Sequence, residues 1–133
     1  QEILRLCREY GECRVEVERM EEARRVKNAL ESVCSMARQR LDISDPALLL
    51  ALLDACEVTR DEGMLQEVLD VVGRNLDRLA VSAESVKLLA CCYYYVEEEE
   101  CVERAGRMLE ELRKMGRGEE ELADVETILE ELT

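Results

Sequence analysis

The chain has no histidine, phenylalanine or tryptophan, and it has one proline in 133 residues. Without histidine, a cysteine nucleophile lacks the imidazole that usually acts as its base, and a zinc site loses half of its usual ligand types. Without Phe and Trp, the core must be built from Leu, Val, Met, Ala and Cys, which together with abundant Glu and Arg favour helices. These absences disfavour most enzymatic functions and favour an all-α protein.

Long hydrophobic runs are also missing. A helix that spans a bilayer needs about eighteen or more apolar residues. The most apolar stretch, Ala47 to Cys56, is shorter than this and is interrupted by Asp54. We therefore expect a soluble protein with no membrane segment.

Seven cysteines are present, an odd number that includes the adjacent pair Cys91 and Cys92. Neighbouring residues do not easily form a strain-free disulfide, so the thiols are expected to be free, core-filling side chains. This usage, with no visible secretory or transit segment, predicts a reducing intracellular compartment, either cytoplasmic or mitochondrial. The spacings do not match a zinc motif, and the glutamates around Cys101 are expected to raise its pKa. We predict no metal, no cofactor and no catalytic residue.

The net charge of −14 is distributed unevenly. Residues 1–41 contain nine basic and eight acidic side chains, whereas the remaining residues contain nine and twenty-four. A nucleic acid would be repelled by such a surface unless the fold gathered the arginines on one face. The charge therefore makes RNA a less favoured partner than protein.

Apolar residues recur at three- and four-residue intervals along most of the chain, which predicts amphipathic helices and no strands. Asp45 before Pro46, and Ser82, have the sequence context of helix N-caps. Gly11, Gly63 and the Gly116–Gly118 segment are typical of helix ends or turns. Seven helices are predicted, over Glu2–Tyr10, Val15–Arg40, Pro46–Val58, Glu62–Leu79, Ala83–Val96, Glu99–Met115 and Glu119–Leu132.

Short connections between these helices indicate antiparallel hairpins. The segments Leu52–Cys56 and Leu88–Cys92 are similar, and they lie thirty-six positions apart in the first helices of two successive pairs. A period of this length is typical of a stacked α-solenoid. We predict a single helical-repeat domain over residues 1–133, with hairpins at about 2–41, 46–79 and 83–115 and a capping helix at 119–132.

The stretch from Ala90 to Cys101, "ACCYYYVEEEEC", is interpreted as a hairpin corner. The tyrosines are expected to fill the groove between hairpins with their hydroxyls at the rim. Glu97 to Glu100 are expected to occupy the turn and the start of the next helix, where carboxylates favour the helix dipole. The run lacks the ligand order of a calcium-binding loop, so we interpret it as a solvated surface.

The segment "LLACCYYY" with the following "RAGRMLEELRKMG" resembles a pentatricopeptide repeat. Leu88, Leu89, Cys91 and Cys92 correspond to the core of its first helix, and "LLDAC" matches the same pattern. Tetratricopeptide repeats share much of it. The resemblance implies a scaffold of stacked hairpins and, for the pentatricopeptide family, RNA bases read by the residue before the Leu-Leu pair. Ala51 and Lys87 occupy that place here.

These observations favour a non-enzymatic scaffold that mediates protein–protein interaction or assembly within a larger complex. An organellar RNA-binding protein is the alternative, and an enzyme regulatory subunit is the third. No small-molecule substrate is evident. Partner contacts are expected at the N-terminal edge and on the basic face of the helix after it, at Ile3, Leu6, Tyr10, Arg24, Arg25, Lys27 and Arg38.

Overall fold

The computed structural model describes residues 2–14, 20–116 and 119–132, and these ranges are all helix and connecting segments, with no strand. The prediction of an all-α protein is therefore confirmed. The helices are α1 (Glu2–Arg14), α2 (Met20–Arg38), α3 (Pro46–Thr59), α4 (Glu62–Arg74), the short 3-10 helix η2 (Leu76–Arg78), α5 (Ala83–Val96), α6 (Glu99–Lys114) and α7 (Glu119–Leu132).

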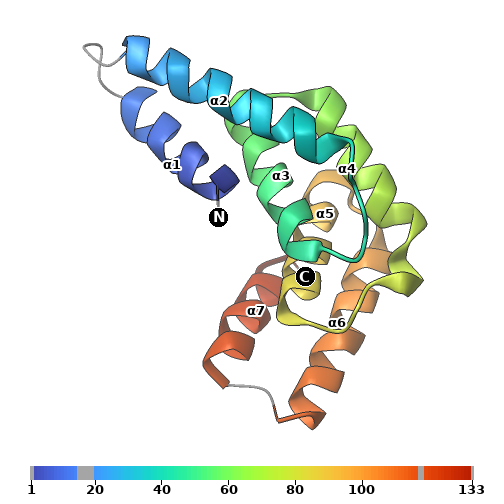
Figure 1. The fold of residues 1–133 in the computed structure, drawn as a ribbon. Helices are drawn as coiled ribbons and strands as arrows, with labels where there is room; N and C mark the ends of the chain where they lie inside the picture. Colours follow the sequence, from blue (N-terminus) through green and yellow to red (C-terminus); the bar gives the residue numbers. More distant parts are fainter. Residues whose placement is uncertain (1, 15–19, 117–118, 133) are drawn as a thin grey trace. The chain divides into compact units, whose positions relative to one another are not determined.

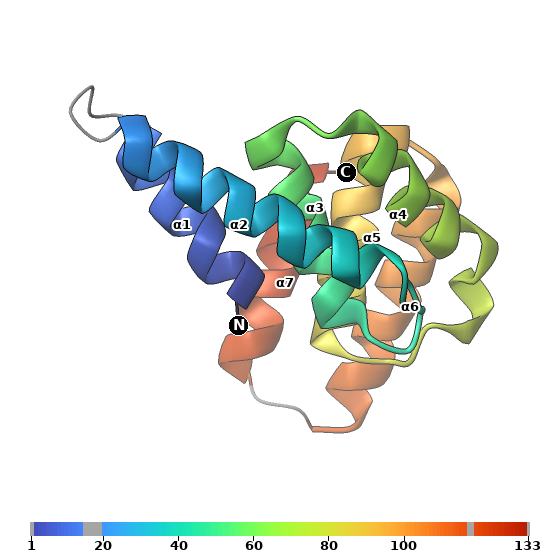
Figure 2. The same ribbon diagram turned by 45° about the horizontal axis from the view of Figure 1, so that its top comes forward.

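Contacts divide the chain into two compact units. Unit 1 contains residues 1–42 and 51–68, and unit 2 contains residues 43–50 and 69–133. In unit 1, α1 and α2 form an antiparallel hairpin, and they lie side by side in both ribbon views (Figures 1 and 2). The buried side chains of this hairpin are aliphatic residues and thiols at helical spacing, namely Ile3, Leu6, Cys13, Ala23, Leu30 and Cys34.

Unit 2 is organised around three helices. α5 packs along α6, and α7 contacts both of them. The surfaces that these helices bury carry Leu, Val, Met, Ala and Cys, because the apolar positions of each helix recur at three- and four-residue intervals. An ion pair between Arg113 on α6 and Glu126 on α7 adds a contact at the surface. The terminal helix is thus anchored within unit 2, while the stacking of hairpins into a solenoid stays a prediction.

The α3–α4 and α5–α6 pairs share a local plan. α3 and α5 have fourteen residues each, and their first residues, Pro46 and Ala83, are 37 positions apart. Each pair is joined by two residues, of which the first has a positive φ, 60° at Arg60 and 52° at Glu97. Equivalent positions of the two pairs are therefore 37 residues apart, one more than the offset between the two similar sequence segments, while a repeat stays a prediction. The sequence does not reveal this difference of one residue, because both offsets align apolar residues of α3 with apolar residues of α5.

The predicted helix caps are confirmed. The Leu48 amide donates to the Asp45 carboxylate (3.1 Å), and the Ser85 amide donates to the Ser82 hydroxyl (3.1 Å). These bonds satisfy amides that have no partner inside the helix. Asp61 caps α4 in the same way through the Met64 amide (3.0 Å), a cap that the sequence analysis missed.

Two predicted helix ends differ by more than two residues: the helix predicted to end at Tyr10 continues to Arg14, and the helix predicted to end at Leu79 ends at Arg74 and is followed by η2. Gly11 lies inside α1, which continues to Arg14, because one exposed glycine lowers helix stability too little to end a helix that packs on a neighbour. Gly116 does mark a turn, with φ of 69° after α6. The predicted start of the second helix, at residues 15–19, and the end of the glycine turn, at residues 117–118, lie outside the described residues.

The turn at Glu97–Glu100 is built as predicted, whereas the filling of a groove between hairpins by the tyrosines stays a prediction for the half-buried Tyr93 and Tyr95 and is wrong for Tyr94. Glu97 ends α5 in a left-handed conformation, Glu98 is the N-cap of α6, and Glu99 and Glu100 form its first turn. Tyr94, however, is 70% exposed, because α5 turns it away from the buried side. Its ring meets that of Tyr95 edge-on, with centroids 5.3 Å apart.

Candidate partner-binding surface

The seven residues predicted to bind a partner do not form one surface. Ile3 and Leu6 are buried, so they are core residues and are not exposed at the N-terminal edge. Their spacing of three places both on the side of α1 that is covered in the folded chain. The residue exposed beside them is Leu4. The predicted contact at the N-terminal edge is therefore corrected for these two positions.

The exposed part of the prediction falls on α2. Met20, Lys27, Glu31 and Arg38 follow one another at intervals of seven, four and seven residues, which places them in one line along the helix. Beside this line lies an open hollow of about 430 Å³, which we call the α2 groove. Its lining comes from the end of α1 and the first half of α2, namely Tyr10, Met20, Ala23, Arg24, Lys27, Asn28 and Glu31.

The α2 groove joins apolar and basic side chains. Ala23 is buried and Tyr10 is half-buried, while Met20 is 62% exposed. Arg24 is exposed and Lys27 is half-buried, and no described residue forms an ion pair or hydrogen bond with either of them. Tyr10 and Met20 thus make one end of the α2 groove apolar. Arg24 and Lys27, one helical turn apart, make its middle positively charged.

The two other predicted cations on α2 have different surroundings. Arg25 does not line the α2 groove, because it follows Arg24 and is turned about 100° further around the helix. Arg38 forms an ion pair with Glu67 on α4, through hydrogen bonds of 2.5 Å and 2.7 Å. This pairing lowers the pKa of the Glu67 carboxyl, mainly through the hydrogen bond from Arg38. The charge of Arg38 is thus compensated within unit 1.

A second, smaller hollow of about 60 Å³ continues along the same side of α2. It shares Glu31 with the α2 groove and reaches Arg38, Asp61 and the buried Cys34. Burial, followed by the nearby Cys7, Asp61 and Glu31, raises the pKa of Cys34 to about 11. A thiol of this kind stays protonated at neutral pH and is a poor nucleophile.

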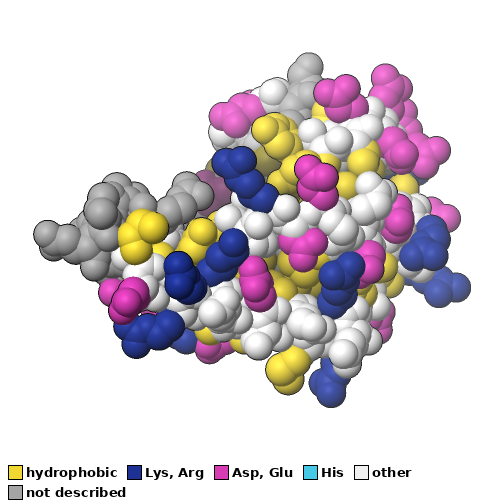
Figure 3. Space-filling view, turned by 90° about the horizontal axis from the view of Figure 1, so that it is seen from above, with side chains coloured by type: hydrophobic (Ala, Val, Ile, Leu, Met, Phe, Trp, Pro, Cys, Tyr) yellow, Lys and Arg dark blue, Asp and Glu magenta, His cyan; other side chains and the backbone are white. Residues whose placement is uncertain are grey.

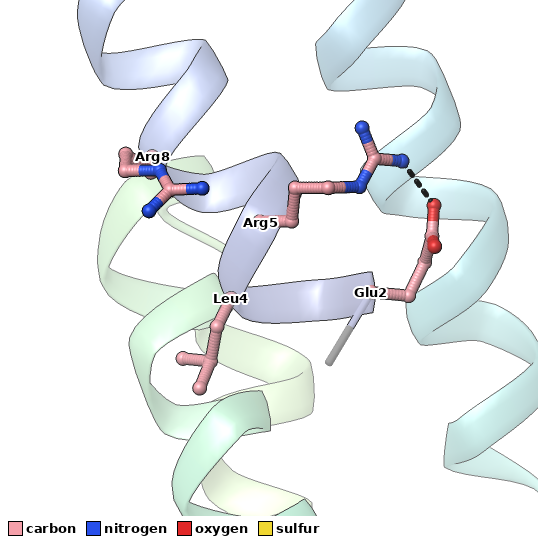
Figure 4. A pocket seen from close by; sticks show the side chains of 4 residues that line it. All are labelled: Glu2, Leu4, Arg5 and Arg8. Atoms are coloured by element: carbon pink, nitrogen blue, oxygen red, sulfur yellow. Dashed lines mark hydrogen bonds and ion pairs between the residues drawn. The ribbon is translucent and has the colours of Figure 1, made fainter.

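A third hollow, of about 390 Å³, lies on the outer side of α1 and is lined by Glu2, Leu4, Arg5 and Arg8. Figure 4 shows that Leu4, Arg5 and Arg8 point in different directions from the helix, and that Arg5 reaches back to Glu2. Arg5 also pairs with Glu9, at 2.6 Å, so two carboxylates hold this guanidinium. These side chains do not converge on a common point, which makes this hollow a weaker candidate.

The cysteines of unit 2 show no sign of a reactive or metal-binding site. Cys92 is buried, and burial followed by the neighbouring Cys101 and Cys91 raises its pKa to about 12. The pKa of Cys101 is raised by burial and then by Glu98 and Glu100, as the acidic sequence around it predicts. In the part of the chain that the structure describes, no group of three or more Cys, Asp or Glu side chains is arranged to hold a metal ion.

The face of the molecule that is seen from above carries both charged and hydrophobic side chains (Figure 3). Lys, Arg, Asp and Glu side chains are interspersed there, with separate hydrophobic areas between them (Figure 3). Among the described helices, none has both the length and the hydrophobicity needed to cross a membrane. Of the three hollows described above, the α2 groove is the one whose lining includes the exposed Met20, Tyr10 and two cations that form no ion pair with a described residue.

Searches of protein-family models, curated proteins and solved structures found no match to this chain. The functional assignment rests on the residues themselves.

Proposed function

We propose that this protein is a non-enzymatic helical scaffold that binds a partner protein within a larger complex, and that the α2 groove is its binding site. The observation that carries the proposal is the combination of the exposed Met20 with Arg24 and Lys27, which form no ion pair with a described residue, on one side of a packed helical hairpin. Apolar contacts with nearby charged groups are the usual make-up of a protein-binding site.

The shape of the α2 groove favours a protein segment over a small molecule. Its volume of about 430 Å³ is within the range of small-molecule pockets, but Met20, Arg24, Asn28 and Glu31 are themselves exposed. A site with exposed walls covers only one side of its ligand, whereas small-molecule pockets bury most of the ligand surface. A segment of a partner protein that lies along α2 can contact all of these side chains.

An enzymatic role is not favoured, because the groups that would have to react are poorly placed for it. Burial raises the pKa values of Cys34 and Cys56 to about 11 and about 12. Glu67 is engaged by Arg38. The described residues that line the α2 groove include no Ser, Thr or Cys that could act as a nucleophile, and the sequence has no His to act as its base.

RNA binding is the second candidate, since Arg24 and Lys27 could also contact phosphates. The residues that would read bases argue against it. Ala51 is buried and its side chain has no polar group, and when the starts of α3 and α5 are aligned, Lys87 corresponds to Leu50 and not to Ala51. Tyr10 is the one aromatic residue among those that line the α2 groove, so a platform for stacking several bases is missing there.

Two methionines on α2 provide a matched test of the proposal. Met20 lines the α2 groove and is 62% exposed, whereas Met36 is 72% exposed and lies outside it. Both can be replaced by glutamate without disturbing the core. We expect Met20→Glu to remove partner proteins that co-purify with the wild-type protein from cell extract, and Met36→Glu to retain them.

The proposal is overturned if both variants keep, or both lose, the same partners. Anisotropy titrations with random and homopolymeric RNA complete the test. Submicromolar binding at about 150 mM salt that Lys87→Ala abolishes would make RNA binding the primary function.

A further inference from the structure

We infer that the α2 groove recognises an acidic protein segment, one that carries an apolar side chain followed about one helical turn later by Asp or Glu. This inference rests on the proposed function, because it names the chemistry of the partner at the same site. It goes further because it states which part of the α2 groove contacts an apolar side chain of the partner and which part contacts a carboxylate of the partner.

The first step is the order of residues along the α2 groove. Tyr10, Met20 and Ala23 form its apolar end. At 1.5 Å per residue, Arg24 lies about 6 Å and Lys27 about 10 Å beyond Met20 along the axis of α2. Glu31 follows at the far end, about 6 Å beyond Lys27. A ligand therefore meets apolar, positive and negative groups in that order.

The second step is the state of the two cations. In unit 1, Arg5 is held by Glu2 and Glu9 and Arg38 is held by Glu67, whereas Arg8 and Arg25, like the two cations of the α2 groove, form no ion pair with a described residue. No described carboxylate pairs with Arg24 or Lys27, although Glu31 is one turn from Lys27. A carboxylate from a partner can form charge-assisted hydrogen bonds with both cations without displacing an internal ion pair.

The third step is the match between the two sides. An apolar side chain of the partner covers Met20 and Tyr10, which lowers the water exposure around Arg24 and strengthens the ion pairs next to it. Glu31 repels a second carboxylate beyond Lys27, so the acidic group is confined to the middle of the α2 groove. A basic segment meets two like charges at the same place.

The test is a selection of random twelve-residue peptides displayed on phage against four proteins. The wild type is compared with Arg24→Glu/Lys27→Glu, with Met20→Glu, and with Arg25→Glu, a control on the same helix outside the α2 groove. We expect the wild type and Arg25→Glu to enrich peptides with an apolar residue and Asp or Glu. The double charge reversal should enrich Lys- and Arg-containing peptides instead.

Selected peptides are then resynthesised and titrated. Arg24→Gln/Lys27→Gln, which removes both positive charges of the α2 groove, should weaken the binding of the peptide selected on the wild type at least about tenfold, since hydrogen bonds to charged groups are stronger than those between neutral groups. Circular dichroism of each variant confirms that it is folded. Arg25→Gln should change the affinity less than about twofold.

The possible failures are distinguishable. If Met20→Glu abolishes binding but the selected peptides are not acidic, the site stands and this inference is wrong. If neither Met20→Glu nor the charge reversal changes the selection, or if no peptide is selected, the proposed site itself is wrong. Displacement of the peptide by homopolymeric RNA at about 150 mM salt overturns the inference in favour of RNA. Self-association of the wild type that the charge reversal abolishes replaces the partner with a second copy of the chain.

Discussion

Arg38 on α2 and Glu67 on α4 are 29 positions apart in the chain and are joined by two parallel hydrogen bonds. The Nε and Nη2 groups of Arg38 donate to the two carboxylate oxygens of Glu67, at 2.5 Å and 2.7 Å. This paired geometry matches the planar guanidinium to the planar carboxylate, which makes it more specific than a single contact. It links two helices of unit 1 that are distant in sequence.

The first prediction concerns this ion pair. Arg38→Glu and Glu67→Arg should each lower the melting temperature slightly, and the double exchange should restore most of the loss. Both side chains are exposed, so the single effects are small and salt-dependent. Equal losses in the single variants that simply add in the double variant would contradict a direct interaction.

The pH dependence of the same pair has a defined sign. Arg38 lowers the pKa of Glu67, so the folded state keeps this carboxylate ionised at pH values where the unfolded state binds a proton. The stabilisation is therefore present at neutral pH and is lost as the pH falls below the ordinary carboxyl value of 4.5. The difference in stability between the wild type and Glu67→Gln should shrink over that range.

The second prediction compares two leucines of unit 1. Leu30 on α2 has no exposed surface, whereas Leu4 on α1 is 45% exposed. Leu30→Ala leaves a cavity in addition to the lost apolar contacts, and should lower the free energy of unfolding by about 2–5 kcal/mol. Leu4→Ala should change it by no more than about 0.5 kcal/mol. Urea denaturation measures both, and similar effects would show that the burial of α2 is misassigned.

The third prediction uses two glycines with opposite backbone geometry. Gly11 lies inside α1, and a Cβ added there meets no atom within 4 Å. Gly11→Ala should raise the free energy of unfolding by about 0.5–1 kcal/mol, because alanine is the better helix former. Gly116 has φ of 69°, so Gly116→Ala should lower it by about 1–2 kcal/mol. A stabilising Gly116→Ala would contradict the left-handed turn after α6.

The fourth prediction concerns the buried thiols. The pKa values of Cys34, Cys56 and Cys92 are raised from 9.0 to about 11, about 12 and about 12, with burial as the largest cause. Between pH 9 and these values the unfolded chain loses thiol protons that the folded protein retains. Stability should therefore fall as the pH rises through this range.

Two measurements check the thiol prediction. Thiolate absorbance of the folded protein should stay low at pH 9 and increase on unfolding. Cys92→Ala should reduce the alkaline loss of stability, and a chelator should leave the helical circular dichroism and melting temperature unchanged. Stoichiometric zinc in the purified protein, or rapid thiolate formation at neutral pH, would contradict this description of the cysteines.

The helices themselves could be predicted closely from the sequence, whereas their register could not. Asp45 and Ser82 cap helices where the sequence indicates, because a cap depends on a few adjacent residues. The similar segments "LLDAC" and "LLACC" are 36 positions apart, whereas the helices that contain them begin 37 positions apart, because apolar segments can be aligned in more than one way. The positive φ of Arg60 and of Glu97 was not predicted, because neither is the glycine expected there, although Glu97 was placed in the turn.

The candidate site was predicted only in part. The basic face of α2 was found from its arginines, but the apolar side chains beside it were not predicted as part of the site. In the structure Met20 and the buried Ala23 line the α2 groove together with Arg24 and Lys27. Ile3 and Leu6 were expected to be available to a partner and are buried instead. A hydrophobic position looks the same in the sequence whether another helix or a partner covers it.

The sequence by itself determined the all-α class, the number of helices and most of their ends, because helical periodicity, caps and turns act over a few neighbouring residues. Only the tertiary structure decided which charged side chains of α2 are held in an internal ion pair and which can bind a partner. Arg24 and Lys27 are uncompensated among the described residues, while Arg38, on the same line of the same helix, is bound by Glu67. Ion pairing depends on distance in space, and the chain must fold before residues 29 positions apart can meet.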